Sequence, residues 1–304
     1  MPAHSRKRRR VAEDRLHLIG QSAAFRELVR QVDAVAPSES TVLLSGEAGS
    51  GKTLIAAVIH DRSARRGRPL VEMNCATTSD VRRALFGQNG AFAMAAKGGT
   101  ILLEEIGLLD LESQAGLVQV LERREFIPER SRRGVRVDAR VIATSNVDLT
   151  EAVAEGRFRG DLLAGLKVCL LYVPPLRDRP DDIPILARYY LDRNARRFGK
   201  QIHDLSPGAL AALMRYTWPG NVRELSHNIQ RAVVRCTGSL LEVEPDPSRA
   251  EWTDEWEREY IRALIRSTRG VIGGPHGAAV LYGYGLRPRV SKSFLEWFRA
   301  MGSS

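Results

Sequence analysis

A glycine-rich loop at residues 46–53 constrains this chain more than any other feature. It follows the apolar, strand-like run 41–45 and precedes a helical run at 54–60. Its members are Gly46, Glu47, Ala48, Gly49, Ser50, Gly51, Lys52 and Thr53. Such a loop turns its backbone N–H groups toward phosphate oxygens, its lysine reaches the β- and γ-phosphates, and its hydroxyl binds Mg²⁺. The loop therefore predicts a nucleotide site, with a merely structural glycine-rich turn as the alternative.

Two adjacent carboxylates end a later apolar run. Residues 98–105 read GGTILLEE, which places Glu104 and Glu105 at the carboxyl end of a predicted strand. In P-loop ATPases the first acid of such a pair holds the Mg²⁺ shell and the second orients the attacking water. The pair therefore predicts Glu104 and Thr53 as metal ligands and Glu105 as the catalytic residue. Two acids that simply open a helix are the alternative.

Strand-like and helical segments alternate through the first part of the chain. The strand-like runs are 41–45, 70–73, 100–103, 137–144 and 168–173. The predicted helices between and before them include 16–35 and 111–123. This alternation predicts an α/β fold with a parallel sheet covered on both faces. Only helical stretches follow, at 183–198, 207–216 and 222–235, which predicts a separate helical subdomain.

The length of 304 residues exceeds what one hydrophobic core normally serves, so we expect several modules. The expected modules are a basic tail (1–12), an α/β nucleotide-binding core (13–180), a helical lid (181–241), a linker (242–251) and an all-α module (252–304). The linker assignment rests on two prolines and several charges within a short stretch.

The chain carries 46 Lys and Arg against 36 Asp and Glu, a formal charge of +10. Five of the basic residues form the run 6–10, which we interpret as a solvated tail or as a salt-dependent contact with nucleic-acid phosphates. The sequence contains neither a long apolar span nor a secretory signal, so we expect a cytoplasmic protein without a membrane partner. Three dispersed cysteines, Cys75, Cys169 and Cys236, fit reduced thiols and neither a disulfide framework nor a zinc site.

A string of further motifs resembles one family, the NtrC-type AAA+ enhancer-binding proteins that activate sigma-54 RNA polymerase. The resemblance covers residues 16–302. The matching segments are 18–22 (LIGQS), 71–76 (VEMNCA), 85–87 (LFG), 137–149 (VDARVIATSNVDL), 174–184 (PPLRDRPDDIP) and 218–225 (WPGNVREL). Their order as well as their letters makes the resemblance specific.

The resemblance implies an AAA+ core with a helical lid, ATP and Mg²⁺ as cofactors, and a ring built from copies of this chain. It implies that Asn74 is a switch acting on Glu105 and that Arg159 enters a neighbour's nucleotide site as an arginine finger. It further implies that Asn146 and Arg223 are the first and second sensors. Leu18 and Ile19 are implied nucleotide contacts. Taken singly, each of these residues also has an ordinary structural explanation.

Three departures from the family pattern bear on function. The family's long hairpin with the GAFTGA tip corresponds here to the short segment 85–100, in which Gly90-Ala91-Phe92 is either the remnant of that tip or the returning strand. Glu104 replaces an aspartate, and Gly165 stands where the family has a second arginine finger. A loop that does not project cannot grip sigma-54, and a missing cation beside the γ-phosphate slows hydrolysis.

The module 252–304 resembles the family's C-terminal helix-turn-helix. Its predicted DNA contacts, mostly to phosphate, are Arg287, Arg289, Lys292 and Arg299. The presumed recognition helix at 291–299 is apolar for that role, so a helical dimerisation module is the alternative.

The leading hypothesis is therefore an ATP-binding, ATP-hydrolysing regulator of the sigma-54 activator family that assembles through its core and binds DNA through its C-terminus. The short segment before the core leaves no room for a sensory domain, so we expect control by a partner protein. A second hypothesis is a DNA-binding regulator that does not drive sigma-54, in which nucleotide sets the oligomeric state or the chain joins the ring of a paralogue. A generic AAA+ remodeller of proteins is a third.

Overall fold

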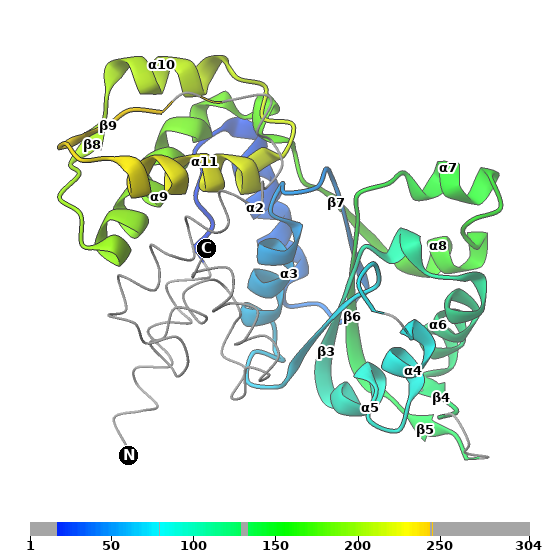
Figure 1. The fold of residues 1–304 in the computed structure, drawn as a ribbon. Coiled ribbons are helices and arrows are strands. Elements are labelled where there is room, and N and C mark those ends of the chain that lie inside the picture. Colours follow the sequence, from blue (N-terminus) through cyan, green and yellow to red (C-terminus); the bar gives the residue numbers. More distant parts are fainter. Residues whose placement is uncertain (1–16, 79, 129–132, 244, 246–304) are drawn as a thin grey trace, which may run out of the picture. The chain divides into compact units, whose positions relative to one another are not determined.

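The computed structural model describes residues 17–78, 80–128, 133–243 and 245 (Figure 1). The chain divides into two compact units, Met1–Arg179 and Pro180–Ser304. The tail 1–12 and the C-terminal module 252–304, with the four predicted DNA contacts Arg287, Arg289, Lys292 and Arg299, lie outside the described residues.

A parallel sheet of five strands in the order β2-β3-β6-β1-β7 forms the centre of the first unit (Figure 1). The strands are β1 (Val42–Ser45), β2 (Leu70–Asn74), β3 (Lys97–Glu104), β6 (Asp138–Ser145) and β7 (Cys169–Tyr172). Seven of the eight residues of β6 are buried, as expected for a central strand covered on both faces. All five predicted strands are therefore confirmed, and their carboxyl ends meet at one edge of the sheet.

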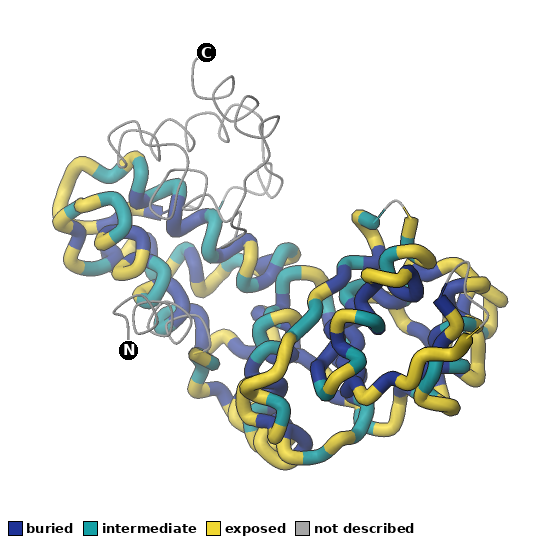
Figure 2. Tube along the Cα trace, turned by 90° about the horizontal axis from the view of Figure 1, so that it is seen from below, coloured by how far each residue is buried: buried dark blue, intermediate teal, exposed yellow. Residues whose placement is uncertain are grey.

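Helices cover both faces of this sheet. On one face pack α2 (Ala23–Val35) and α3 (Lys52–Asp61), through side chains such as Val32 and Ile59. The helices of the other face are α4 (Val81–Phe86), α5 (Ala91–Ala95), α6 (Leu111–Arg123), α7 (Leu149–Ala154) and α8 (Gly160–Leu166). Buried residues follow the strands and the inner sides of these helices, whereas the exposed ones lie mainly on the loops and outer faces (Figure 2).

The helix predicted at 16–35 is shorter than expected, because it begins only at Ala23. The Ser22 hydroxyl accepts a hydrogen bond from the N–H of Phe25 at 3.2 Å and so caps the helix there. The short helices on the second face were not predicted from the sequence. Nor was the small antiparallel pair of β4 (Glu125–Phe126) and β5 (Val135–Arg136).

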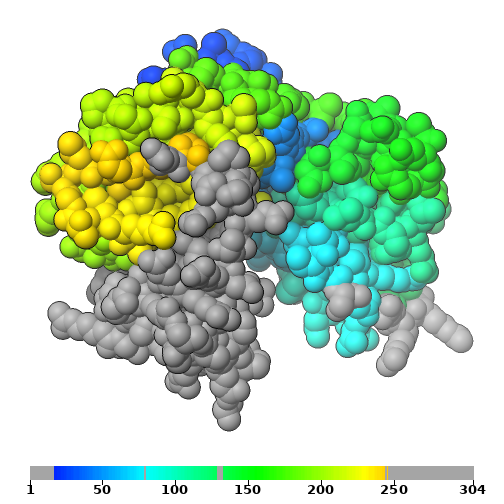
Figure 3. Space-filling model, turned by 45° about the horizontal axis from the view of Figure 1, so that its top comes forward, coloured from blue at the N-terminus to red at the C-terminus, as the bar shows by residue number. Residues whose placement is uncertain are grey.

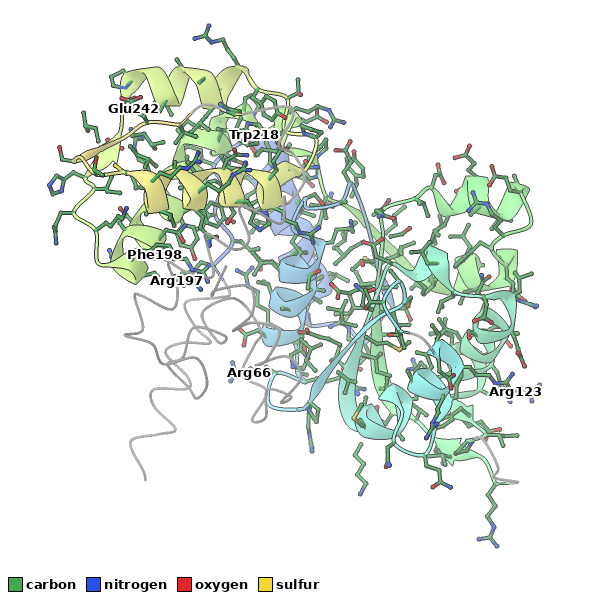
Figure 4. The ribbon with its side chains drawn as sticks, viewed as in Figure 1. Arg66, Arg123, Arg197, Phe198, Trp218 and Glu242 are labelled. Carbon is green, nitrogen blue, oxygen red and sulfur yellow. The ribbon has the colours of Figure 1, made fainter. Side chains whose placement is uncertain are left out.

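Three helices make up most of the described part of the second unit. They are α9 (Ile183–Phe198), α10 (Pro207–Arg215) and α11 (Asn221–Arg235), accompanied by the parallel pair β8 (Asp204–Leu205) and β9 (Leu240–Leu241). Trp218 is fully buried within this unit and donates its indole N–H to the carbonyl oxygen of Leu213 at 2.9 Å (Figure 4). The predicted helical subdomain is thus confirmed.

Short 3₁₀ turns complete the described elements. They are η1 (Ile106–Leu108) after β3, η2 (Leu176–Asp178) after β7 and η3 (Pro180–Asp182) before α9. Among the described residues no helix has both the length and the apolar character that crossing a membrane requires.

Candidate functional site

The glycine-rich loop joins the end of β1 to the first turn of α3. Its glycines hold backbone conformations that side chains rarely adopt, with φ of 155° at Gly46, 74° at Gly49 and 110° at Gly51. A Cβ atom at Gly46 would lie 2.5 Å from the carbonyl oxygen of Val173, so the close approach of β7 excludes any larger residue. The loop is thus shaped by its glycines, as the motif predicts.

Lys52 is the first residue of α3 and is only 6% exposed. Its Nζ donates to the carbonyl oxygens of Gly46 at 2.8 Å and of Glu47 at 3.0 Å. The same atom lies 4.0 Å from Oε1 of Glu105. The ammonium group is therefore held inside the curl of the loop, beside the carboxylates that end β3.

The two predicted carboxylates lie next to the loop but face different groups. The Thr53 hydroxyl donates to the carboxylate of Glu104, the last residue of β3. Glu105 follows in a left-handed backbone conformation with φ of 55°, and its N–H donates to Oγ1 of Thr144 at 3.3 Å. Among the residues that the structure describes, the buried Oε2 of Glu105 has no hydrogen-bond partner. Within the described part of the chain, this oxygen therefore has unused capacity to accept a proton or a hydrogen bond.

Asn74 and Asn146 end the strands on either side of β3. The register of β2 and β3 sets Asn74 opposite Glu104. The Asn74 side-chain oxygen accepts from the N–H groups of Ala76 at 2.8 Å and of Thr77 at 3.2 Å, and no hydrogen bond joins it to Glu105 in the described structure. Asn146 is exposed and follows Ser145, whose carbonyl oxygen accepts from the N–H of Gly46 at 3.2 Å. Both asparagines thus lie at the edge of the sheet where the loop begins.

The Cys75 thiol lies behind this edge and is only 4% exposed. Burial, together with the negative charges of Glu104 and Glu105, raises the pKa of Cys75 to about 12. The thiol is therefore neutral at physiological pH and does not serve as a nucleophile.

Two arginines after β7 hold the loop from outside, and the sequence analysis gave neither of them a role. Arg177 makes two hydrogen bonds to the carboxylate of Glu47, at 2.8 and 2.5 Å. Arg179 is 2% exposed, donates to the carbonyl oxygen of Ser50 at 2.8 Å and stacks over the ring of Phe25 at 5.1 Å. The sheet order could have indicated their role. Strands β7 and β1 are parallel neighbours, so the residues after β7 lie near the glycine-rich loop that follows β1.

Arg159 lies in the loop between α7 and α8, two helices whose green atoms form part of the surface of the first unit in Figure 3. Its exposed guanidinium pairs with both carboxylate oxygens of Asp161, at 3.0 and 2.6 Å. This ion pair raises the pKa of Arg159 above its usual value. In the described structure, no hydrogen bond or ion pair joins Arg159 to the glycine-rich loop of its own chain. Gly165 lies within α8, and a Cβ atom there would lie 3.4 Å from Leu121.

The remaining predicted contacts are less close to the loop or belong to the other unit. Leu18 is partly buried and packs on the apolar cluster of the α2 face, and Ile19 beside it is also partly buried. Arg223 lies on α11 of the second unit with an exposed side chain. Among the described residues no group of three or more His, Cys, Asp or Glu side chains is placed to hold a metal.

The segment 85–100 forms neither a projecting hairpin nor a returning strand at Gly90-Ala91-Phe92. Residues 87–90 make a tight turn between α4 and α5, closed by a 2.9 Å hydrogen bond from the N–H of Gly90 to the carbonyl oxygen of Gly87. Phe92 is fully buried in α5 and stacks on Phe86, with ring centroids 5.6 Å apart. Packing of this aromatic side chain turns the segment inward.

Comparisons with known proteins give the following matches. The sigma-54 interaction domain family matches residues 18–172, and the AAA+ ATPase lid domain family matches residues 177–253. The chain is 41% identical to the DNA-binding transcriptional activator HyfR of Escherichia coli (strain K12), a match that covers 88% of this chain and 45% of HyfR. It is 43% identical to the transcriptional regulatory protein ZraR of Klebsiella oxytoca, covering 86% of this chain and 58% of ZraR. The chain thus spans about half the length of these curated relatives.

Solved structures match over nearly the whole chain. NtrX from Brucella abortus in complex with ADP gives a TM-score of 0.75 at 29% identity, covering 98% of this chain and 73% of that one. NtrX in complex with ATP gives a TM-score of 0.74 at 28% identity over the same share of this chain.

Proposed function

Because this chain belongs to the sigma-54 interaction domain family, we propose that it is an AAA+ regulator of transcription that binds and hydrolyses ATP and works as a self-assembled ring on sigma-54 RNA polymerase. HyfR is a transcriptional activator, and NtrX has been crystallised with ADP and with ATP. The observation that carries the proposal is that the glycine-rich loop, through Lys52 and Thr53, lies against the paired carboxylates at the end of β3.

The loop fits a triphosphate. A Cβ atom at Gly51 would meet nothing within 4 Å, so the backbone of the loop is open to a ligand there. The Ser50 hydroxyl is buried and has no hydrogen-bond partner in the described part of the chain. Lys52 exchanges two carbonyl contacts for phosphate oxygens when ATP binds, and the start of α3 adds its positive dipole.

Thr53 and Glu104 are the residues that would hold Mg²⁺, with water and phosphate oxygens filling the remaining positions. Their hydroxyl–carboxylate contact places two oxygen ligands side by side. When bound, Mg²⁺ neutralises the charge on the β- and γ-phosphate oxygens. The additional methylene group of Glu104, compared with aspartate, is accommodated if a water lies between carboxylate and metal.

Glu105 orients and polarises the attacking water. Its free Oε2 is the acceptor, and its backbone is fixed by the hydrogen bond to Thr144. Asn146, which directly follows the last residue of β6, senses the γ-phosphate. Asn74 acts as the switch when its side chain leaves its own turn and reaches Glu105.

Arg159 acts on the nucleotide of a neighbouring copy, and this requires a ring. It leaves Asp161 to do so, at little cost, because an exposed ion pair is screened by solvent and contributes little. Arg223 of the lid serves as the second sensor. Because Gly165 carries no cation, Arg159 is the arginine that the neighbouring copy supplies to each nucleotide site.

ATP turnover measured against protein concentration tests this proposal. We expect turnover per chain to rise with concentration, to fall about 10²-fold or more in Glu105→Gln and to fall about 10³-fold in Arg159→Ala. Glu112→Gln is the control, because this exposed carboxylate on α6 pairs with Arg82. Turnover that is independent of concentration, or equal in Glu105→Gln and Glu112→Gln, would contradict the proposal.

The turn at 87–90 favours a second candidate function, a regulator in which nucleotide controls assembly but sigma-54 is not driven. The aromatic side chain of Phe92 lies in the core, so the described segment offers no tip that projects toward a partner. Open-complex formation on a sigma-54 promoter distinguishes the two functions. The candidate stands if ATP is turned over and no open complex forms.

DNA binding by the module 252–304 remains part of the proposal. Contacts of Arg287, Arg289, Lys292 and Arg299 to phosphate predict an affinity for duplex DNA that falls steeply with salt. Replacing the four by alanine is expected to flatten this salt dependence, and an unchanged slope would favour the dimerisation module.

A further inference from the structure

Gln114 is a fully buried amide on α6, opposite the loop that carries Arg159. Its Nε2 donates to the carbonyl oxygens of Leu109 at 2.7 Å and of Arg157 at 3.0 Å. Its Oε1 accepts from the backbone N–H of Arg159 at 2.8 Å. Both N–H bonds of the amide and one oxygen lone pair are therefore used on backbone atoms of two separate segments.

One of these segments directly follows the catalytic residue Glu105 in the chain. The carbonyl oxygen of Glu105 accepts from the N–H of Leu108 at 3.0 Å, and that of Ile106 accepts from the N–H of Leu109 at 3.2 Å. Leu109 then offers its own carbonyl oxygen to Gln114. The turn that follows Glu105 is thus hydrogen-bonded to the amide.

The other segment is the loop that carries Arg159. The carbonyl oxygen of Ala152 accepts from the N–H groups of Arg157 at 2.9 Å and Phe158 at 3.0 Å, and the Phe158 ring is buried in the core. The guanidinium of Arg159 itself touches only the neighbouring Asp161 among the described residues. Gln114 therefore holds the backbone N–H of Arg159, while the carbonyl oxygen of the same residue accepts from the N–H of Leu163 at 3.1 Å, where α8 begins.

We propose that Gln114 is a positioning residue for the arginine finger: it fixes the Arg159 backbone to the segment after Glu105, and thereby acts on the neighbouring copy's nucleotide site. This inference rests on the proposed function of Arg159. A displacement of about 1 Å in a catalytic group lowers a rate by about 10²-fold, and loss of the amide removes the hydrogen bond that joins the Arg159 N–H to α6.

The test is a mixing experiment with Gln114→Met, which keeps the length of the side chain and removes its hydrogen bonds. We expect turnover to fall roughly 10- to 100-fold, while the affinity for a fluorescent ATP analogue stays within a factor of about three, because the chain's own loop is intact. Gln119→Met on the same helix is the matched control and is expected to keep full turnover. If Gln114→Met does not fold by circular dichroism, Gln114→Asn retains the amide and is used in its place.

Mixing with Glu105→Gln then separates action in trans from a local effect. A Glu105→Gln chain is inactive in its own site but still supplies a correctly placed Arg159 to its neighbour. An equal mixture with Gln114→Met is therefore expected to turn over ATP several-fold faster than the sum of the two variants measured alone. Arg159→Ala mixed with Glu105→Gln is the reference and should be rescued in the same way.

The outcomes are distinct. Rescue of Arg159→Ala without rescue of the Gln114 variant overturns this inference, because the amide then acts within its own chain. Wild-type turnover by Gln114→Met overturns it as well. Failure of both mixtures, or full turnover by Arg159→Ala, overturns the proposed finger itself and this inference with it.

Discussion

Two arginines contact the glycine-rich loop, one of them buried and the other exposed. Arg179 is buried, bonds to the Ser50 carbonyl oxygen and stacks on Phe25, whereas Arg177 pairs with Glu47 at the surface. A buried cation that loses its partners is costly, whereas an exposed ion pair is screened by solvent and contributes little. Arg179 is therefore the structural anchor of the loop.

We expect Arg179→Ala to lower the free energy of unfolding by about 2–4 kcal/mol, because it removes a buried hydrogen bond and the contact with Phe25. It should also weaken binding of an ATP analogue by about tenfold, because the loop loosens. Arg177→Ala is the matched variant and should change both quantities far less, because its ion pair with Glu47 is exposed. Denaturant unfolding and nucleotide titration measure the two effects, and equal effects of the two variants would contradict this division.

The candidate site also shows which residues a sequence reveals. The motifs assigned Lys52, Thr53, Glu104 and Glu105 to one predicted nucleotide site. In the structure Thr53 contacts Glu104, and Lys52 lies 4.0 Å from Glu105. Gln114 and Arg179 were not singled out, because they bond to backbone atoms of distant segments, and such contacts leave no local pattern of residue types.

Among the elements, the helices with a clear apolar period were predicted closely and the very short ones were missed. The bounds of α6 and α9 coincide with the predicted ranges, since each spans several turns with regular apolar spacing. The five residues of α5 have no such period, and tertiary packing decides their conformation. The aromatic cluster of Phe86, Phe92 and Phe126 supplies that packing.

We expect Phe92→Ala to lower the free energy of unfolding of the first unit by about 3–5 kcal/mol, because it leaves a cavity within this cluster. Met94→Ala in the same helix, at a position that is 56% exposed, should change it by less than about 0.5 kcal/mol. Denaturant titration followed by far-ultraviolet circular dichroism measures both. Equal effects of the two would mean that Phe92 is not buried as described.

α11 gives the helical unit a dependence on pH. Burial, and then the charges of Arg223 and Arg231, lower the pKa of His227 to about 4, so the folded unit keeps this imidazole neutral. The unfolded chain binds a proton near pH 6.5. Stability is therefore complete above about pH 6.5 and is lost as the pH falls toward 4, by up to about 1.4 kcal/mol per pH unit.

Trp218 reports this loss, since the first unit contains no tryptophan. In a chain with Trp252, Trp256 and Trp297 replaced by Phe, the midpoint of unfolding by fluorescence should fall between pH 7 and pH 5. His227→Gln should remove most of the decrease. An undiminished decrease in that variant would assign it to other groups.

At the scale of the whole molecule, nucleotide binding and folding are linked in the first unit. A ligand at 100 times its Kd adds about 2.7 kcal/mol to stability, which for a unit of this size corresponds to roughly 5–11 °C in Tm. We expect ATP with Mg²⁺ to raise the transition of the first unit by this amount, measured by calorimetry. Lys52→Ala should show no such shift, and a shift that persists in it would place the nucleotide elsewhere.

The left-handed backbone conformation of Glu105 affects how this chain can evolve. A side chain in the left-handed region costs about 1–2 kcal/mol, and glycine or asparagine there relieves most of that cost. Mutation therefore has a simple route to a more stable protein that still binds nucleotide and has lost its carboxylate. Selection for the proposed hydrolysis opposes that route, so we expect the identity of this one residue in any descendant to record whether that activity has been retained.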